Sequence, residues 1–142
     1  MTAWHKLVIS VIGALAFGVA VAVFGFRSLM SNSCTNQVLA EVPSPEGTLK
    51  AVVFERDCGA TTAFSTQISV LPAAASLQDG PANLFAAAAA HGKAPSSRGR
   101  GPVVRVTWIG PRSLRVAHDR DTRVLLASHN AAGVSAEYVP FE

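Results

Sequence analysis

The chain has 142 residues, of which 49% are hydrophobic and 15% charged, and its formal net charge is +3. This length allows one small domain in addition to an apolar N-terminal stretch. The absence of CxxC, HExxH or EF-hand spacing leads us to expect no bound metal, and we expect no cofactor. The basic residues are accompanied by no stacking aromatic side chain beyond Trp108, so we expect no nucleic-acid partner.

Residues 7–26 (LVISVIGALAFGVAVAVFGF) carry no charge, and Ser10 is the only polar side chain among them. A helix of this length rises about 30 Å, the thickness of the hydrocarbon core of a bilayer. We therefore predict a cytoplasmic N-terminus (1–6), a single transmembrane helix (7–26), a short stalk (27–37) and an extracytoplasmic β domain (38–142).

Two features favour this orientation. Lys6 precedes the apolar stretch together with the terminal amine, whereas Arg27 alone follows it, so the positive-inside rule favours a cytoplasmic N-terminus by a small margin. Cys34 and Cys58 both follow the stretch, and a cysteine pair in a small domain fits an oxidising compartment. The alternative is a pair of unrelated reduced thiols in a cytoplasmic domain.

Cleavage of the apolar stretch is a separate question. The stretch is longer than the apolar region of a typical secretory signal, and no A-x-A site follows it. Acylation of Cys34 is the lipoprotein alternative, but the preceding residues 31–33 read SNS, and Leu29 is displaced from its lipobox position. We therefore expect an uncleaved anchor in a bacterial cell membrane.

Small residues recur every four positions within this stretch, at Ala14, Gly18 and Ala22. Residues at this spacing share one face of a helix and let a second transmembrane helix approach closely. The pattern predicts self-association or a membrane-protein partner, although Ala-rich and Gly-rich anchors show such spacing by chance.

Patterns typical of strands follow the stalk. Residues 50–56 are β-branched and aromatic, with apolar side chains on both faces. Residues 63–71 alternate, which places Phe64, Thr66, Ile68 and Val70 on one face and Ser65, Gln67 and Ser69 on the other. The short separation of the two segments predicts an antiparallel hairpin.

The second half of the chain continues this pattern. Residues 83–90 are ambiguous because five alanines favour helix, but their β-patterned surroundings favour a strand. Residues 103–109 alternate with Trp108 facing inward, and the alternation resumes after a turn to form a second hairpin. Segments 123–127 and 133–139, joined by His129 and Asn130, complete the sheet. We predict a small, mainly antiparallel all-β domain, either a sheet or a sandwich.

The segment SPEGTLKAVVFERDCGATTAFSTQIS (residues 44–69) resembles a pattern in small bacterial envelope proteins of unknown function. Those proteins have an N-terminal hydrophobic segment or lipoprotein signal followed by a short β domain. The resemblance implies an envelope location and brings no activity with it.

Cys34 and Cys58 are the first candidate site. A disulfide between them would close a loop of about 24 residues and stabilise the domain by about 3 kcal/mol. The alternative is a small envelope enzyme or redox protein in which Cys58 is a thiol nucleophile. That chemistry needs a base, and the candidates are His91, His118 and His129, none of which lies in a recognisable motif.

Charged residues suggest two weaker sites. His118, Asp119 and Asp121 contain metal-ligand types, but Arg120 and Arg123 between and beside them favour a solvated turn. Basic residues gather between positions 93 and 123, and Lys93, Arg98 and Arg100 are candidates for contact with an anionic surface. The simpler interpretation is a solubilising face. Taken together, the sequence predicts a non-catalytic, membrane-anchored interaction or accessory module.

Overall fold

The computed structural model describes residues 3–31, 34–59, 62–89 and 100–141, and for residues 27–31 it describes only the backbone. The chain divides into two compact units, Met1–Ser33 and Cys34–Glu142. Each unit is described by itself.

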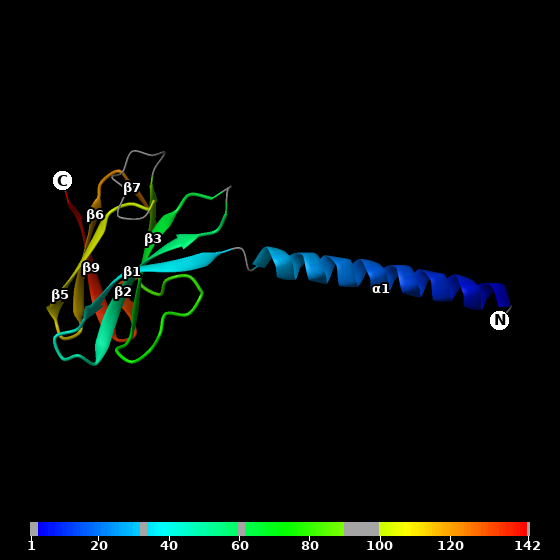
Figure 1. Ribbon diagram of the computed structural model, residues 1–142, viewed down its shortest axis with the longest axis horizontal. Coiled ribbons are helices and arrows are strands. Elements are labelled where there is room, and N and C mark those ends of the chain that lie inside the picture. The colour runs from blue at the N-terminus through cyan, green and yellow to red at the C-terminus, as the bar shows by residue number, and fades with distance from the viewer. Residues whose placement is uncertain (1–2, 32–33, 60–61, 90–99, 142) are drawn as a thin grey trace. The chain divides into compact units, whose positions relative to one another are not determined.

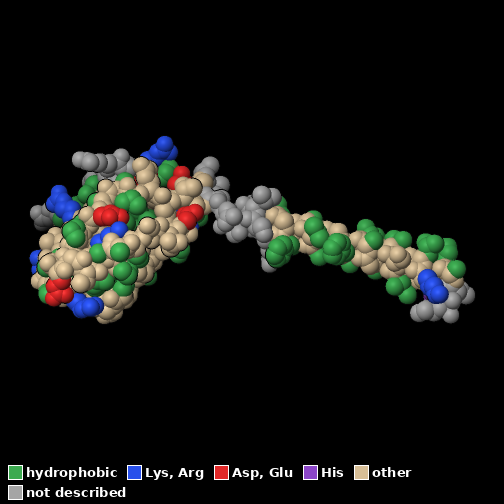
Figure 2. Space-filling view, turned by 60° about the horizontal axis from the view of Figure 1, so that its bottom comes forward, with side chains coloured by type: hydrophobic (Ala, Val, Ile, Leu, Met, Phe, Trp, Pro, Cys, Tyr) green, Lys and Arg blue, Asp and Glu red, His purple; other side chains and the backbone are tan. Residues whose placement is uncertain are grey.

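The first unit contains one helix, α1 (Ala3–Ser31). Its segment Ala3–Phe26 is long and apolar enough to cross a membrane, a property shared by anchors and signal sequences. Large apolar side chains on it are exposed, such as Phe17 at 73% and Phe24 at 77%, so α1 is not the core helix of a globular unit. Figure 2 shows these hydrophobic side chains along the helix, with a basic side chain near its N-terminal end.

The helix and the first strand both enter the segment that the sequence assigned to a stalk. Helical backbone continues to Ser31, and strand backbone begins at Thr35. Phe26 and Arg27 therefore do not mark the end of the helix. Hydrophobicity defines how much of a helix suits a bilayer but not where the backbone stops being helical.

The described part of the second unit contains nine strands. They are β1 (Thr35–Pro43), β2 (Leu49–Asp57), β3 (Ser65–Pro72), β4 (Phe85–Ala89), β5 (Val104–Gly110), β6 (Ser113–Asp119), β7 (Thr122–Ala127), β8 (Asn130–Ala131) and β9 (Val134–Phe141). One sheet has the order β1-β2-β3-β4-β7 and the other β5-β6-β9-β8. Figure 1 shows most of these strands with their labels. The all-β domain predicted from the sequence is confirmed, with two sheets.

Both predicted hairpins are present, since β2 pairs antiparallel with β3 and β5 with β6. The ambiguous segment is strand β4. Segments 123–127 and 133–139 were expected to complete one sheet, but they lie in different sheets: β7 joins β4 in the first, and β9 lies parallel to β6 in the second. The turn after Asp119 therefore carries the chain from one sheet to the other.

The main core lies between the two sheets. Side chains that are completely buried include Ile68 of β3, Phe85 of β4 and both Leu114 and Val116 of β6. Trp108 of β5 packs against this core, as its position in the alternation predicted. The alternation predicts the inward face correctly wherever the opposite face of the strand meets solvent.

The outer face of β2 and β3 is buried as well, which the alternation of β3 did not predict. Ser65, Gln67 and Ser69 form the polar side of the alternation, yet each is no more than 6% exposed. Residues 73–83, which we call the covering segment, lie over this face. Their Leu77 and Ala82 form a second apolar cluster with Val52 and Phe54 of β2.

A β-bulge in β1 sets which of its side chains face the core. Gln37 pairs with Glu55, but Ala40 rather than Leu39 pairs with Val53, so Leu39 is the extra residue. Without the bulge, period-2 alternation would turn the charged Glu41 inward. With it, Val42 faces the core, and Glu41 pairs with Lys50 at 3.1 Å.

Candidate functional site

Cys34 and Cys58 are joined by a disulfide with an S–S distance of 2.08 Å and a Cα–Cα distance of 3.9 Å. The β1–β2 register produces this pairing. Thr35 lies opposite Asp57, so the residues just before β1 and just after β2 are the next facing pair. The bridge ties the residue that begins the β domain to the end of its second strand.

This bond removes the thiol that the nucleophile hypothesis requires, as long as it stays oxidised. The candidate bases lie elsewhere: His118 stacks on Phe85 with a centroid distance of 5.6 Å, and His129 meets the edge of Tyr138. His91 is outside the described residues. The structure therefore does not bring a cysteine and a base together in the part of the chain that it describes.

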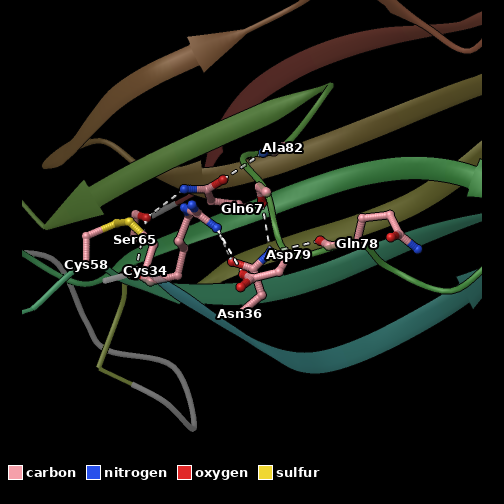
Figure 3. Close-up of polar contacts among 10 residues, drawn as sticks. Cys34, Asn36, Cys58, Ser65, Gln67, Gln78, Asp79 and Ala82 are labelled. Carbon is pink, nitrogen blue, oxygen red and sulfur yellow. Dashed lines mark hydrogen bonds and ion pairs between the residues drawn. A yellow bond between two sulfur atoms is a disulfide. The ribbon is translucent and has the colours of Figure 1, made fainter. Parts of the chain in front are cut away.

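A polar network beside the disulfide holds the covering segment in place (Figure 3). Asn36 donates from Nδ2 to the carbonyl oxygens of Gln78 at 3.2 Å and Gly80 at 2.7 Å. Its Oδ1 accepts a 2.7 Å hydrogen bond from Arg56, whose guanidinium lies 3.6 Å from Asp79. A single asparagine thus connects β1, β2 and the covering segment.

Deeper contacts satisfy the polar groups that this segment buries. Gln67 accepts from the Ala82 backbone N–H at 2.8 Å and donates to Ser65 at 2.9 Å. Asn83 exchanges two 2.9 Å hydrogen bonds with the backbone of Val70, in the manner of a neighbouring strand. The polar face of β3 is therefore a hydrogen-bonding surface for the protein's own loop.

A polar pocket of about 180 Å³ lies on the other face of the same β1–β2 pair, and its lining residues are Thr35, Gln37, Glu55, Asp57, Phe64 and Arg100. Glu55, only 6% exposed, accepts hydrogen bonds from the backbone N–H groups of Arg100 and Gly101. Thr66 donates to the Pro102 carbonyl oxygen at 2.6 Å. These contacts fasten residues 100–102, which we call the crossing segment, over the inner face of the first sheet.

Arg100, a candidate for contact with an anionic surface, lies in this pocket. Its guanidinium is 4.7 Å from the centroid of the Phe64 ring, and Glu55 and Asp57 are among its neighbours in the pocket wall. Lys93 and Arg98, the other two candidates, lie outside the described residues. The pocket wall therefore contains two carboxylates as well as this guanidinium.

An apolar cleft of about 440 Å³ opens between the edge strands of the two sheets, and its lining residues are Leu39, Ala40, Val42, Val53, Thr66 and Val104–Thr107. It lies on the same inner face as the polar pocket. The Trp108 indole N–H donates to the Val42 carbonyl oxygen at 3.0 Å and bridges β5 and β1 near the cleft. The cleft is a concave surface that the sequence alone did not indicate.

Tyr138 and Phe85 form an aromatic stack at the β4 side of the core, with their centroids 5.5 Å apart. The Tyr138 hydroxyl donates to the carbonyl oxygens of Leu84 and Ser128, which links the second sheet to the first. Burial raises the pKa of Tyr138 from 10.0 to about 12, because it disfavours the charged phenolate.

We expect the single tyrosine of the chain to titrate near pH 12 in the folded protein and near pH 10 in denaturant. Between these values the unfolded chain binds fewer protons than the folded one, so this group's contribution to stability is complete below pH 10 and is lost as pH rises through 12. Tyrosinate absorbance measures both midpoints. Equal midpoints in the two states would contradict the buried hydroxyl.

Ala14, Gly18 and Ala22 line a shallow apolar depression of about 480 Å³ on α1, together with Val11, Leu15 and Val19. The three small residues thus share one face, as their spacing predicted. Within the described residues nothing covers this face.

No group of three or more His, Cys, Asp or Glu side chains that could hold a metal ion occurs in the described ranges. Asp119 instead accepts a 2.8 Å hydrogen bond from the Asp121 backbone N–H, as expected for a turn.

The sequence analysis did not identify the buried Glu55 as a site residue, and it did not identify the strands β1 and β5 that border the apolar cleft. Glu55 continues the inward alternation of Ala51 and Val53, which was a signal that it points toward the second sheet. The cleft gave no comparable signal, because it depends on which strands become the edges of the two sheets.

Comparison of the chain with protein-family models, with curated proteins and with solved structures gives no match.

Proposed function

We propose that this chain is a single-pass protein of the bacterial cell membrane whose β domain lies outside the cytoplasm and acts as a non-catalytic interaction or accessory module. The disulfide is the observation that carries the proposal. A Cys34–Cys58 bond persists in an oxidising compartment, and it lies within a few residues of an apolar helix long enough to cross a bilayer.

The chemistry of the domain supports binding rather than turnover. Buried polar side chains such as Gln67, Glu55 and Asn83 are engaged with the protein's own backbone. The apolar cleft at the sheet edges provides a concave surface. Apolar grooves of this kind are typical of sites that bind a partner protein. The helix face of Ala14, Gly18 and Ala22 is suited to a second membrane helix, from another copy or from a different protein.

The location is tested on cells that express the full chain. Spheroplasts, in which the cytoplasmic membrane is the outermost barrier, are treated with a membrane-impermeant maleimide, before and after a membrane-impermeant reductant, and the protein is weighed intact. We expect the unprocessed 14.8 kDa chain, with no label before reduction and two labels after it. The matched control is the same labelling of cells permeabilised with detergent.

Two results would overturn the proposal. Labelling that requires permeabilisation would place the domain in the cytoplasm. A mass that begins at Cys34 with added acyl chains would replace the helical anchor with a lipid, and it would leave Cys58 as a lone thiol.

A further inference from the structure

We propose that the apolar cleft binds an extended peptide segment of a partner protein, which pairs with the free edge of β5 and carries an acidic side chain next to Arg105. This inference rests on the proposed function, because it names the kind of partner that the interaction module would take.

The shape of the cleft indicates that it follows a main-chain edge. Four consecutive residues of β5, Val104–Thr107, line it. Successive side chains of a strand point to opposite faces, so consecutive residues line one cavity only when it runs along the edge between those faces. Within its sheet β5 pairs with β6 alone, which leaves its outer edge unpaired among the described strands.

The edge of β5 is regular where it lines the cleft. From Val104 to Trp108 it pairs residue by residue with β6, and its irregularity comes only after Trp108. The opposite lip, β1, is interrupted by the bulge at Leu39, and a bulge disrupts further ladder pairing. An added strand therefore pairs with β5, and β1 provides an apolar wall through Leu39 and Val42.

The size of the cleft matches a short segment. Its 440 Å³ lies within the range of small binding pockets. At about 3.3 Å per residue, the regular edge accommodates about five or six residues, of which alternate ones point inward. Those inward side chains meet Val42, Val53 and Val106, so they must be apolar.

Hydrogen-bonding groups at the edge distinguish a peptide from an acyl chain. A lipid chain fills the apolar volume equally well, but it offers no partner to the main-chain N–H and C=O groups of the β5 edge. An extended peptide satisfies these groups and fills the cavity at once, which is the general mode of β-strand addition.

The charge of Arg105 indicates which side chain the peptide would carry on its outward face. Arg105 is the one charged side chain among the described residues of the cleft. Its guanidinium lies 4.9 Å from the centroid of Phe141, and it belongs to none of the ion pairs seen in the described part of the chain. Phe141 belongs to β9, on the other side of β6 from the free edge, so this guanidinium points away from that edge. To pair with an outward-pointing carboxylate on the added strand, the Arg105 side chain has to turn from Phe141 toward the free edge of β5.

The test uses the full chain in phosphatidylcholine nanodiscs and the fluorescein-labelled hexapeptide Thr-Val-Glu-Val-Thr-Val, with fluorescence anisotropy as the readout. A second peptide has Lys in place of Glu. A third is N-methylated at every residue, which removes every N–H group that a ladder with β5 needs. Arg105→Glu is the charge variant, and Arg123→Glu on β7, at the opposite edge of the first sheet, is its matched control.

We expect the Glu peptide to bind the native chain about fivefold more tightly than the Lys peptide, with the preference reversed by Arg105→Glu and kept by Arg123→Glu. N-methylation should weaken binding by about tenfold. Absence of binding, a preference that Arg123→Glu changes equally, or indifference to N-methylation would overturn the proposal. Displacement of the probe by palmitate, combined with indifference to N-methylation, would assign the cleft to an acyl chain.

Nanodiscs expose both membrane faces, so this result does not depend on the orientation of the chain in cells. Failure of the maleimide test with intact peptide binding would refute only the location. Failure of peptide binding with the expected labelling would refute only the assignment of the cleft.

Discussion

Replacing Cys34 and Cys58 together by alanine is expected to lower the free energy of unfolding of the β domain by about 3 kcal/mol. The bridge spans a sequence separation of 24, and removing it frees the unfolded chain to explore many more conformations. Urea unfolding of the full chain in detergent measures the loss, with Trp108 fluorescence followed in a Trp4→Phe background. The midpoint should fall by about 1 to 3 M.

Reduced native protein is the control for this experiment, because reductant breaks the same bond without changing a side chain. Reductant and the double variant should give the same midpoint, and Cys34→Ala alone should match them, because either change removes the bridge. An unchanged midpoint in reductant would contradict a structural role for the disulfide. Such a result would return Cys58 to consideration as a reactive thiol.

Most strands of the domain were predictable because their alternation records burial on one face. The segment containing Trp108 is an example, as its inward and outward residues follow the sequence pattern. The alternation of Ser65, Gln67 and Ser69 failed because a polar side chain also faces inward when a backbone group of the covering segment satisfies it. The alternation along a strand shows which side chains are polar. A polar side chain is exposed only where no other segment of the protein covers it and satisfies its hydrogen bonds.

Sheet membership was beyond the sequence for a different reason. The pairing of β7 with β4, and the parallel pairing of β6 with β9, join segments whose separation along the chain leaves no local signal. The bulge at Leu39 also left no local signal. It becomes visible only through the pairing with β2, where it keeps Glu41 outside and Val42 inside. The disulfide was predictable from cysteine count and location, whereas the cleft depends on sheet edges and was not.

Replacing Gly101 by alanine is expected to lower the free energy of unfolding by about 3 kcal/mol, the upper end of the usual cost of overpacking. An added Cβ would lie 2.5 Å from Thr66 Oγ1 and 2.9 Å from the Thr66 backbone nitrogen. Thr66 is only 1% exposed and its hydroxyl is bonded to Pro102, so it has no room to rotate away. The crossing segment must shift, which weakens the 2.8 Å hydrogen bond from Gly101 to Glu55.

Gly80→Ala is the matched control, because a Cβ at Gly80 meets nothing within 4 Å, and we expect its free energy of unfolding to stay within about 0.5 kcal/mol of the native value. Thr66→Ala combined with Gly101→Ala should recover only part of the loss, since the contact with the backbone nitrogen remains after the hydroxyl is removed. Equal midpoints for the Gly101 and Gly80 variants would show that the crossing segment does not lie against β3. Because Thr66 also lines the apolar cleft, the Gly101 variant should in addition weaken peptide binding, whereas the Gly80 variant should not.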